Sequence, residues 1–216
     1  MRSPASLILL ALPLSLAAPA PAAGGGASFG SSTQNAGSAC KGMTLVFARG
    51  TTEGGNMGMV AGPPFAQALA KKMGGDLAVQ GVEYPADVKG FLAGGDAAGS
   101  QKMATLVTQM MAACPNTKMV MAGYRQASPS PRGGQLVHNA ATMLPPDVMA
   151  QVNSAVIFGD PMNGKAVGAL PAAQTKVICH QGDNICQGGN LILQPHLTYG
   201  MNADEAATFA ATAAGR

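Results

Sequence analysis

Short apolar runs alternate with longer amphipathic stretches along most of the chain. The short runs contain almost no polar positions, a pattern typical of strands that are buried on both faces of a parallel sheet. Strands are therefore expected at Thr44–Ala48, Val79–Tyr84, Lys118–Ala122, Ala155–Phe158 and Lys176–Cys179.

The longer stretches have the period of a helix. Helices are expected at Pro64–Met73, Ala97–Ala113, Gly134–Met143 and Ala203–Ala214. Methionines, leucine and valine recur every three or four residues in the second of these, and we interpret them as core packing. Five strands interleaved with helices predict a three-layer α/β domain around a central parallel sheet. Its functional site should lie at the carboxyl ends of the strands.

The first 39 residues differ from the rest of the chain. Arg2, an apolar run at 7–12 and a small-residue exit at 20–22 are typical of a secretory signal peptide over residues 1–22. An amphipathic N-terminal helix is the alternative. The run is too short to span a bilayer, so no transmembrane segment is expected. Residues 23–39 are rich in Gly, Ser and Ala and predict a flexible lead-in, which leaves one domain over residues 40–216.

Composition narrows the function classes. Charged residues make up 11% of the 216 residues and hydrophobic residues 47%, which excludes disorder driven by charge. The net charge is +3 and the chain contains no basic run, so nucleic acid is not an expected partner. We expect a secreted, extracellular monomer.

Four cysteines follow the leader: Cys40, Cys114, Cys179 and Cys186. In an oxidising compartment an even number suggests two disulfides, with three possible connectivities. Proximity in sequence favours the pairing of Cys179 with Cys186, which leaves Cys40 for Cys114. The alternative is a metal site that also uses His180 and Asp183, but its spacing fits no zinc pattern. No metal or organic cofactor is expected.

Three histidines are candidates for proton transfer. His138 lies within a predicted helix and is expected to be structural or exposed, whereas His180 follows a strand and could be either. His196 lies on a predicted loop and is a candidate general base, with a structural role as the alternative. Asp183 lies between Cys179 and Cys186, where it could orient such a base or form an Asx turn.

A nucleophile is harder to find. The elbow pattern G-x-S-x-G requires a strand before it and a helix after it, and its one literal match, residues 26–30, has neither. The correct context is the strand at Lys118–Ala122. It continues as Gly123-Tyr124-Arg125-Gln126-Ala127, with arginine in place of serine.

From Cys40 to Phe209 the chain resembles the fungal cutinases, which are serine esterases of the α/β-hydrolase class. The resemblance rests on Phe47–Glu53, Glu83–Ala86, Gly94–Ser100, Cys114-Pro115, and the stretch from Cys179 to Cys186 that runs on into Pro195–Gly200. It implies disulfides Cys40–Cys114 and Cys179–Cys186, Asp183 as the orienting acid and His196 as the base. It also implies an oxyanion hole formed by Thr51 and by the residue after the nucleophile.

The elbow departs from the family pattern Gly-Tyr-Ser-Gln-Gly-Gly. Eight residues, 125–132, stand where the family has Ser-Gln. Aligned from the left, Arg125 takes the nucleophile position and Gln126 the oxyanion position. Aligned from the right, Pro131 and Arg132 take them. A displaced exon boundary in a gene model and a true insertion would leave the same trace.

Two serines in the inserted segment, Ser128 and Ser130, are poor substitutes. Each precedes a proline, which lacks the N–H that the oxyanion requires. The leading hypothesis is therefore a secreted cutinase-type esterase acting on cutin-like hydrophobic polyesters, and inactive or impaired as written. The alternatives are a catalytically silent protein of the same fold that binds lipid, wall polymer or a host partner, and an acetylxylan-type carbohydrate esterase.

Overall fold

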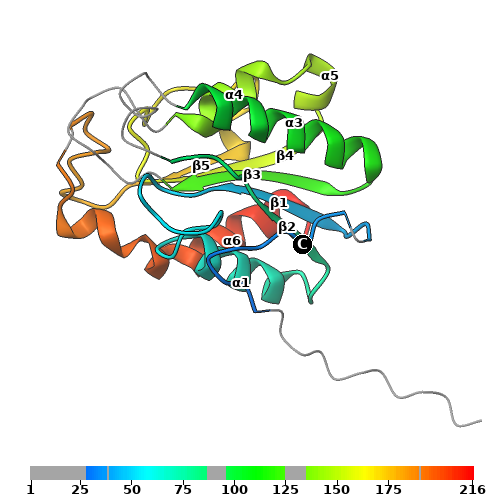
Figure 1. The fold of residues 1–216 in the computed structure, drawn as a ribbon, viewed down its shortest axis with the longest axis horizontal. Coiled ribbons are helices and arrows are strands. Elements are labelled where there is room, and N and C mark those ends of the chain that lie inside the picture. Colours follow the sequence, from blue (N-terminus) through cyan, green and yellow to red (C-terminus); the bar gives the residue numbers. More distant parts are fainter. Residues whose placement is uncertain (1–27, 38, 87–95, 125–134, 190) are drawn as a thin grey trace, which may run out of the picture.

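The computed structural model describes residues 28–37, 39–86, 96–124, 135–189 and 191–216. A five-stranded sheet lies between two layers of helices (Figure 1). The strand order is β2-β1-β3-β4-β5, and every neighbouring pair is parallel. The three-layer α/β architecture with a central five-stranded parallel sheet is thus confirmed.

The strands lie close to their predicted positions. They are β1 Met43–Ala48, β2 Leu77–Gly81, β3 Lys118–Tyr124, β4 Val152–Phe158 and β5 Thr175–Ile178. Every residue of β1 and β2 is buried, as continuous apolar runs predict for a sheet that is covered on both faces.

The second strand shows the largest difference, because it ends at Gly81 instead of Tyr84. The carbonyls of Tyr84 and Pro85 accept hydrogen bonds from the guanidinium of Arg49, at 2.7 and 3.4 Å. The buried Arg49 side chain, and not a neighbouring strand, thus binds the backbone after β2. The apolar pattern of the sequence does not predict such a side-chain contact.

Helices cover both faces of the sheet. They are α1 Gly62–Lys72, α3 Ala97–Ala113, α4 Leu136–Met143, the short α5 Pro146–Met149 and α6 Ala203–Ala213. In Figure 1, α1 and α6 pack on one face while α3 and α4 pack on the other. Short 3-10 helices, η1 Ala172–Gln174 and η2 Gln194–Asn202, were not predicted from the sequence.

Residues 28–37 take part in the fold. We expected a flexible lead-in over residues 23–39, but Phe29 is buried in the core. Asn35 pairs with Val79 through its backbone N–H at 3.0 Å and its side-chain oxygen at 2.6 Å. This segment covers the outer edge of β2, which would otherwise present unpaired backbone groups.

The strand order locates the functional edge. The chain moves outward from β1 to β2 and then returns to the other side of β1 to form β3. The loops that leave β1 and β3 therefore diverge, and in open α/β sheets ligands bind at this kind of switch point. In the part of the chain that the structure describes, no helix is long and apolar enough to cross a membrane.

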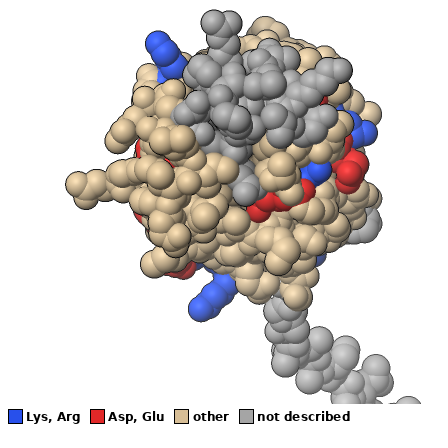
Figure 2. Space-filling model, turned by 60° about the vertical axis from the view of Figure 1, so that its left-hand side comes forward, with Lys and Arg blue, Asp and Glu red and all other residues tan. Residues whose placement is uncertain are grey.

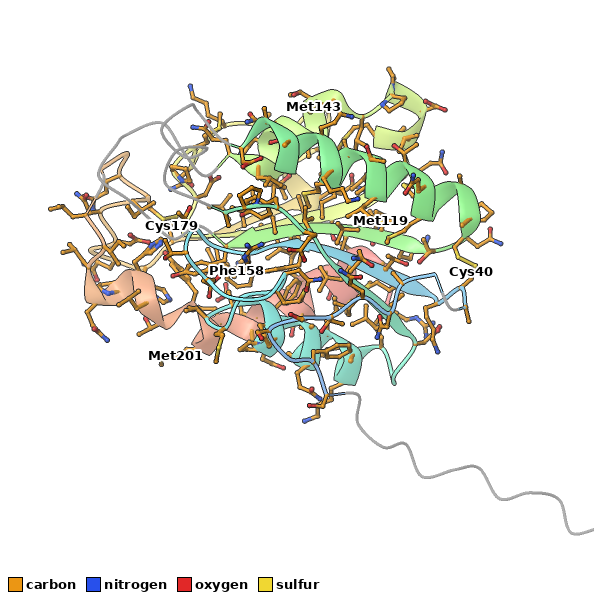
Figure 3. All side chains as sticks on the ribbon, in the orientation of Figure 1. Cys40, Met119, Met143, Phe158, Cys179 and Met201 are labelled. Carbon is orange, nitrogen blue, oxygen red and sulfur yellow. A yellow bond between two sulfur atoms is a disulfide. The ribbon has the colours of Figure 1, made fainter. Side chains whose placement is uncertain are left out.

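The two predicted disulfides are confirmed. Cys40 bonds to Cys114 and Cys179 to Cys186, across 74 and 7 residues of sequence. Cys40 and Cys179 lie at opposite ends of the sheet (Figure 3). The first bridge ties the start of β1 to the end of α3, and the second closes the loop that contains Asp183.

We expect the two bridges to differ in their effect on stability. The double variant C40S/C114S should lose about 4 kcal/mol of unfolding free energy, because the bridge restrains a long loop in the unfolded chain. The matched variant C179S/C186S should lose about 2–3 kcal/mol. Urea unfolding followed by circular dichroism measures both, and equal losses would contradict the loop-entropy account.

Candidate active site

The loop after β1 is held by the side chain of Glu53. Its Oε2 accepts a hydrogen bond from the N–H of Gly50 at 2.7 Å. Its Oε1 accepts from the N–H groups of Met59 and Val60, at 2.8 and 3.0 Å. Three backbone donors that converge on one carboxylate make strong, charge-assisted bonds. The segment that includes Thr51 is therefore fastened at both of its ends.

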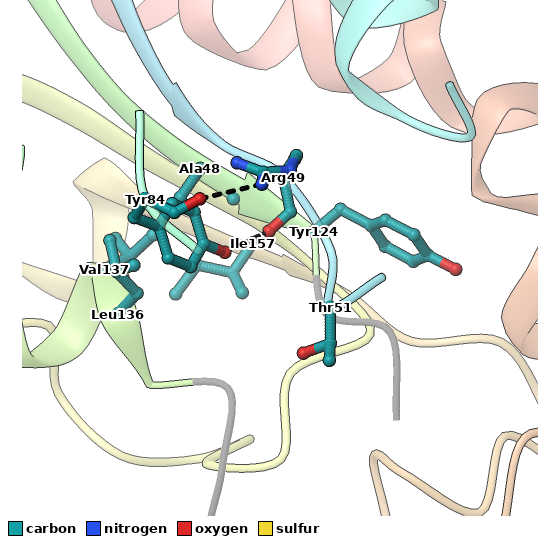
Figure 4. Close-up of a pocket in the computed structure, with 9 residues that line it drawn as sticks. Ala48, Arg49, Thr51, Tyr84, Tyr124, Leu136, Val137 and Ile157 are labelled. Carbon is teal, nitrogen blue, oxygen red and sulfur yellow. Dashed lines mark hydrogen bonds between the residues drawn. The ribbon is translucent and has the colours of Figure 1, made fainter. Parts of the chain in front are cut away.

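Arg49 joins this loop to the segment after β2. The buried guanidinium donates through Nε to the carbonyl of Glu53 at 2.8 Å. Through Nη2 it donates to the carbonyl of Tyr84 at 2.7 Å (Figure 4). It also lies 4.9 Å from the centre of the Tyr84 ring, within the range of a cation–π contact. Buried charge thus fixes the backbone on one side of the switch point.

A small cavity of about 30 Å³ opens where β1 and β3 end (Figure 4). Its lining comes from the ends of β1, β3 and β4, the segments after β1 and β2, and the start of α4: Ala48, Arg49, Thr51, Tyr84, Gly123, Tyr124, Leu136, Val137 and Ile157. Thr51, the expected oxyanion residue, therefore lies on the same cavity as Tyr124, the last described residue of β3.

Asp183 is fully buried in the loop that the Cys179–Cys186 bridge closes. Its Oδ1 accepts the N–H of Ile185 at 3.0 Å, which is an Asx turn. Its Oδ2 faces Nδ1 of His196 at 2.8 Å. The two interpretations of this residue from sequence are therefore compatible, because each uses a different oxygen of the same carboxylate.

His196 lies in η2 and is also fully buried. The hydroxyl of Tyr124 donates to its carbonyl at 3.0 Å. The Tyr124 and His196 rings stack with their centroids 5.4 Å apart. An imidazole and a carboxylate from the C-terminal part of the chain thus meet the tip of β3, as an acid–base pair in a hydrolase would require.

His180 has a structural role. Its Nδ1 and Nε2 lie 2.6 Å from the carbonyl of Pro195 and from Oδ1 of Asn202, respectively. Its ring stacks on Tyr199 with centroids 4.2 Å apart. These contacts tie the end of β5 to η2 and so help to place His196.

The structure therefore brings Asp183 and His196 together and places Thr51 on the same edge of the sheet. Arg125 and Gln126 lie outside the described residues. The metal alternative is wrong, because Cys179 and Cys186 are bonded to each other and have no thiolate to offer. Among the residues that the structure describes, no cluster of three or more His, Cys, Asp or Glu could hold a metal ion.

Sequence reasoning did not single out Arg49, Glu53 or Tyr199. The first two lie in a quoted motif directly after β1, at a strand end, and that position was the available signal. Tyr199 follows His196 by three residues, the spacing of one turn. The hydroxyl of Tyr199 bonds to Asp183, which lies 16 residues away in sequence, so this contact could not be predicted from the local pattern.

Comparisons with known proteins agree on one family. The Cutinase family model matches residues 39–214. A cutinase from Botryotinia fuckeliana is 57% identical over 178 residues, which cover 82% of this chain and 85% of the relative. A cutinase from Monilinia fructicola is 55% identical over 177 residues, with the same coverage. The solved structure of Trichoderma reesei cutinase with a phosphonate inhibitor has a TM-score of 0.77 at 41% identity and covers 87% of this chain and 81% of its own.

A second buried histidine–aspartate pair lies beside the first. His138 of α4 contacts Oδ2 of Asp160, just after β4, through Nε2 at 3.0 Å. Its Nδ1 lies 3.0 Å from the carbonyl of Ala166. Both ring nitrogens thus face acceptors, and only the doubly protonated imidazolium donates to both. The helix that follows the elbow is held to β4 by this ion pair.

From the His138–Asp160 pair we expect the unfolding free energy of the protein to depend on pH. Burial of the ring opposes its charged form, but the hydrogen bond and charge of Asp160 and the Ala166 carbonyl outweigh it, so the pKa of His138 is raised above 6.5. Because the folded-state pKa is the higher one, the stabilisation is present below pH 6.5 and is lost as pH rises through the raised value.

Urea unfolding between pH 5 and pH 9 should show this loss. The variant H138Q should unfold about 3 kcal/mol more easily at pH 5, because it leaves Asp160 buried without a cation. It should also lose the decline in stability above pH 6.5. An unchanged decline in H138Q would show that another group is responsible.

Proposed function

The chain belongs to the cutinase family, and from that premise we propose that it is a secreted serine esterase of the cutinase type. Its substrates would be ester bonds of hydrophobic polyesters such as cutin. The observation that carries the proposal is the buried Asp183–His196 contact of 2.8 Å, set beside the tip of β3. The two disulfides support an oxidising, extracellular location.

The reaction would be acyl transfer through a serine at the elbow. The serine oxygen attacks the ester carbonyl while His196 accepts its proton and then returns it to the leaving alcohol. Water then attacks the acyl-serine with His196 again as the base, which releases the acid and regenerates the serine. Asp183 holds the imidazole in the tautomer that this transfer needs. Thr51 and the N–H of the residue after the nucleophile would stabilise the oxyanion. Neither a metal nor an organic cofactor takes part in this scheme.

An apolar rim suits a hydrophobic acyl chain. Leu191, Ile192 and Leu193 precede His196 and are 58%, 41% and 41% exposed, so they are not core residues. Leu197 and Met201 of η2 are exposed as well. Charged side chains form only small patches on this side of the molecule (Figure 2). Such a surface favours contact with an aliphatic polymer over a charged ligand.

The elbow sequence sets a limit on this activity. Arg125 stands where the family has serine, and Gln126 stands at the oxyanion position. An arginine remains protonated and cannot act as a nucleophile. We therefore propose that the chain as written is nearly inactive. The same sequence favours a second candidate, a catalytically silent protein that uses the apolar rim to hold lipid or wall polymer. An acetylxylan-type esterase is a third, weaker candidate.

The chain as written should hydrolyse p-nitrophenyl butyrate at a rate on the order of 10⁶-fold below that of an enzyme with an intact serine, since the nucleophile is missing. A fluorophosphonate probe, which reacts with competent serines, should leave it unlabelled. Labelling at Ser128 or Ser130 would contradict the proposed inactivity.

Restoring the family elbow should restore the enzyme. In this variant residues 125–132 are replaced by Ser-Gln, which recreates Gly-Tyr-Ser-Gln-Gly-Gly. It should react with the probe and hydrolyse the butyrate ester. The matched control adds Asp183→Asn, which should reduce kcat by about 10⁴-fold because the imidazole takes the wrong tautomer. A repaired chain that folds but neither labels nor hydrolyses would favour the silent binder.

The rim should matter more for long acyl chains than for short ones. In the repaired enzyme, L191S/L193S should lower kcat/KM on p-nitrophenyl octanoate roughly fivefold and leave the acetate ester nearly unchanged, because apolar contact grows with chain length. Met143 of α4 is 43% exposed and supplies the control M143S. Equal effects of the two variants would show that the rim does not contact the acyl chain.

A further inference from the structure

Tyr199 occupies the centre of the candidate site, although no step above uses it. Its ring is fully buried and packs edge-on against His196, with centroids 5.6 Å apart. Its hydroxyl accepts the backbone N–H of His180 at 3.1 Å and donates to Oδ2 of Asp183. Both partners belong to the segment that the second disulfide restrains.

The direction of these bonds is fixed by their chemistry. A backbone N–H can only donate, so it takes a lone pair of the Tyr199 oxygen. The hydroxyl proton is then directed to the carboxylate of Asp183. The same oxygen, Oδ2, also faces Nδ1 of His196 at 2.8 Å. Two donors therefore share one carboxylate oxygen.

The ring has little freedom to leave this position. It stacks on His180 at 4.2 Å and packs against Phe158 at 6.2 Å. Gly159 adopts a φ of +65°, and a Cβ there would lie 2.5 Å from Cε1 of His196 and 3.0 Å from Cε2 of Tyr199. A glycine at the end of β4 thus allows both rings to approach the strand.

We propose that Tyr199 is a positioning residue, which holds the carboxylate of Asp183 toward His196 and sets how strongly that carboxylate binds the imidazole. The inference rests on the proposed Asp183–His196 couple. Burial, with the hydrogen bond to Asp183 next, raises the pKa of the Tyr199 hydroxyl well above its ordinary value, so the phenol remains a neutral donor.

The electronic effect has a definite sign. A hydroxyl that donates to Oδ2 withdraws negative charge from it and weakens the bond between that oxygen and Nδ1 of His196. Removal of the hydroxyl should strengthen the His196–Asp183 bond. A more acidic phenol at the same place should weaken it.

Proton NMR of the chain as written tests this without any turnover. In Y199F the Nδ1–H resonance of His196 should move downfield, and with 3-fluorotyrosine at position 199 it should move upfield. Y124F is the control, because its lost hydroxyl donates to the carbonyl of His196 and not to Asp183. Opposite shifts from the two variants cannot come from general loosening of the site, which would act in one direction. No shift in either variant, or shifts of the same sign, would overturn the proposal.

The repaired enzyme gives a second readout. There Y199F should lower kcat about tenfold, the loss expected for one hydrogen bond to a charged group, with KM changed less than twofold. An equal rise in KM would point to a structural role. If the repaired enzyme shows no hydrolysis, the proposed function fails, while the NMR shifts still decide the role of Tyr199.

Discussion

The buried contact between Asp183 and His196 depends on three separate restraints that converge on one place. The disulfide Cys179–Cys186 closes the loop that contains the carboxylate. η2 carries the imidazole, and the Tyr124 hydroxyl holds its backbone at the tip of β3. A carboxylate is costly to bury unless its hydrogen bonds are satisfied, and here three donors face it: Ile185, Tyr199 and His196. The carboxylate of Asp183 is therefore buried with hydrogen-bond partners for both of its oxygens.

The same principle is repeated around the edge of the sheet. Glu53 and Arg49 satisfy the backbone of the loops after β1 and β2. His138 and Asp160 join α4 to the end of β4. Glu53 and Arg49 thus satisfy backbone groups beyond the strand ends, whereas the contact of His138 with Asp160 links two side chains. The strand ends thus become a rigid frame, on which loops of different sequence can carry chemistry.

The elbow is the exception to this agreement. Asp183 and His196 lie 2.8 Å apart, as the proposed acid–base pair requires, whereas the proposed loss of activity rests on the sequence from Arg125 to Arg132 alone. The described frame is compatible with either proposal, an impaired esterase or a binding protein. The distinction depends on residues 125–132, which would have to supply both the nucleophile and one oxyanion N–H, whereas the proposed acid and base come from other segments.

Several features could be read from the sequence because they depend on local pattern. Apolar runs predicted all five strands, because a strand that is buried on both faces is hydrophobic at nearly every position. The pairing of Cys179 with Cys186 followed from their proximity, and the resemblance to cutinases singled out Asp183 and His196, whose side chains the structure places 2.8 Å apart. These inferences needed only short stretches of chain or a resemblance between motifs.

Other features were decided by the tertiary structure, because they join residues far apart in sequence. Asp160 and His138 are 22 residues apart, and Arg49 and Tyr84 are 35 apart. The early end of β2 and the packing of residues 29–35 on its edge follow from such contacts. The convergence of Tyr199 and His196 on one oxygen of Asp183 also appears only after folding. Sequence patterns report which surfaces are apolar, whereas the partner of a buried polar group is set by where the strands and loops meet in space.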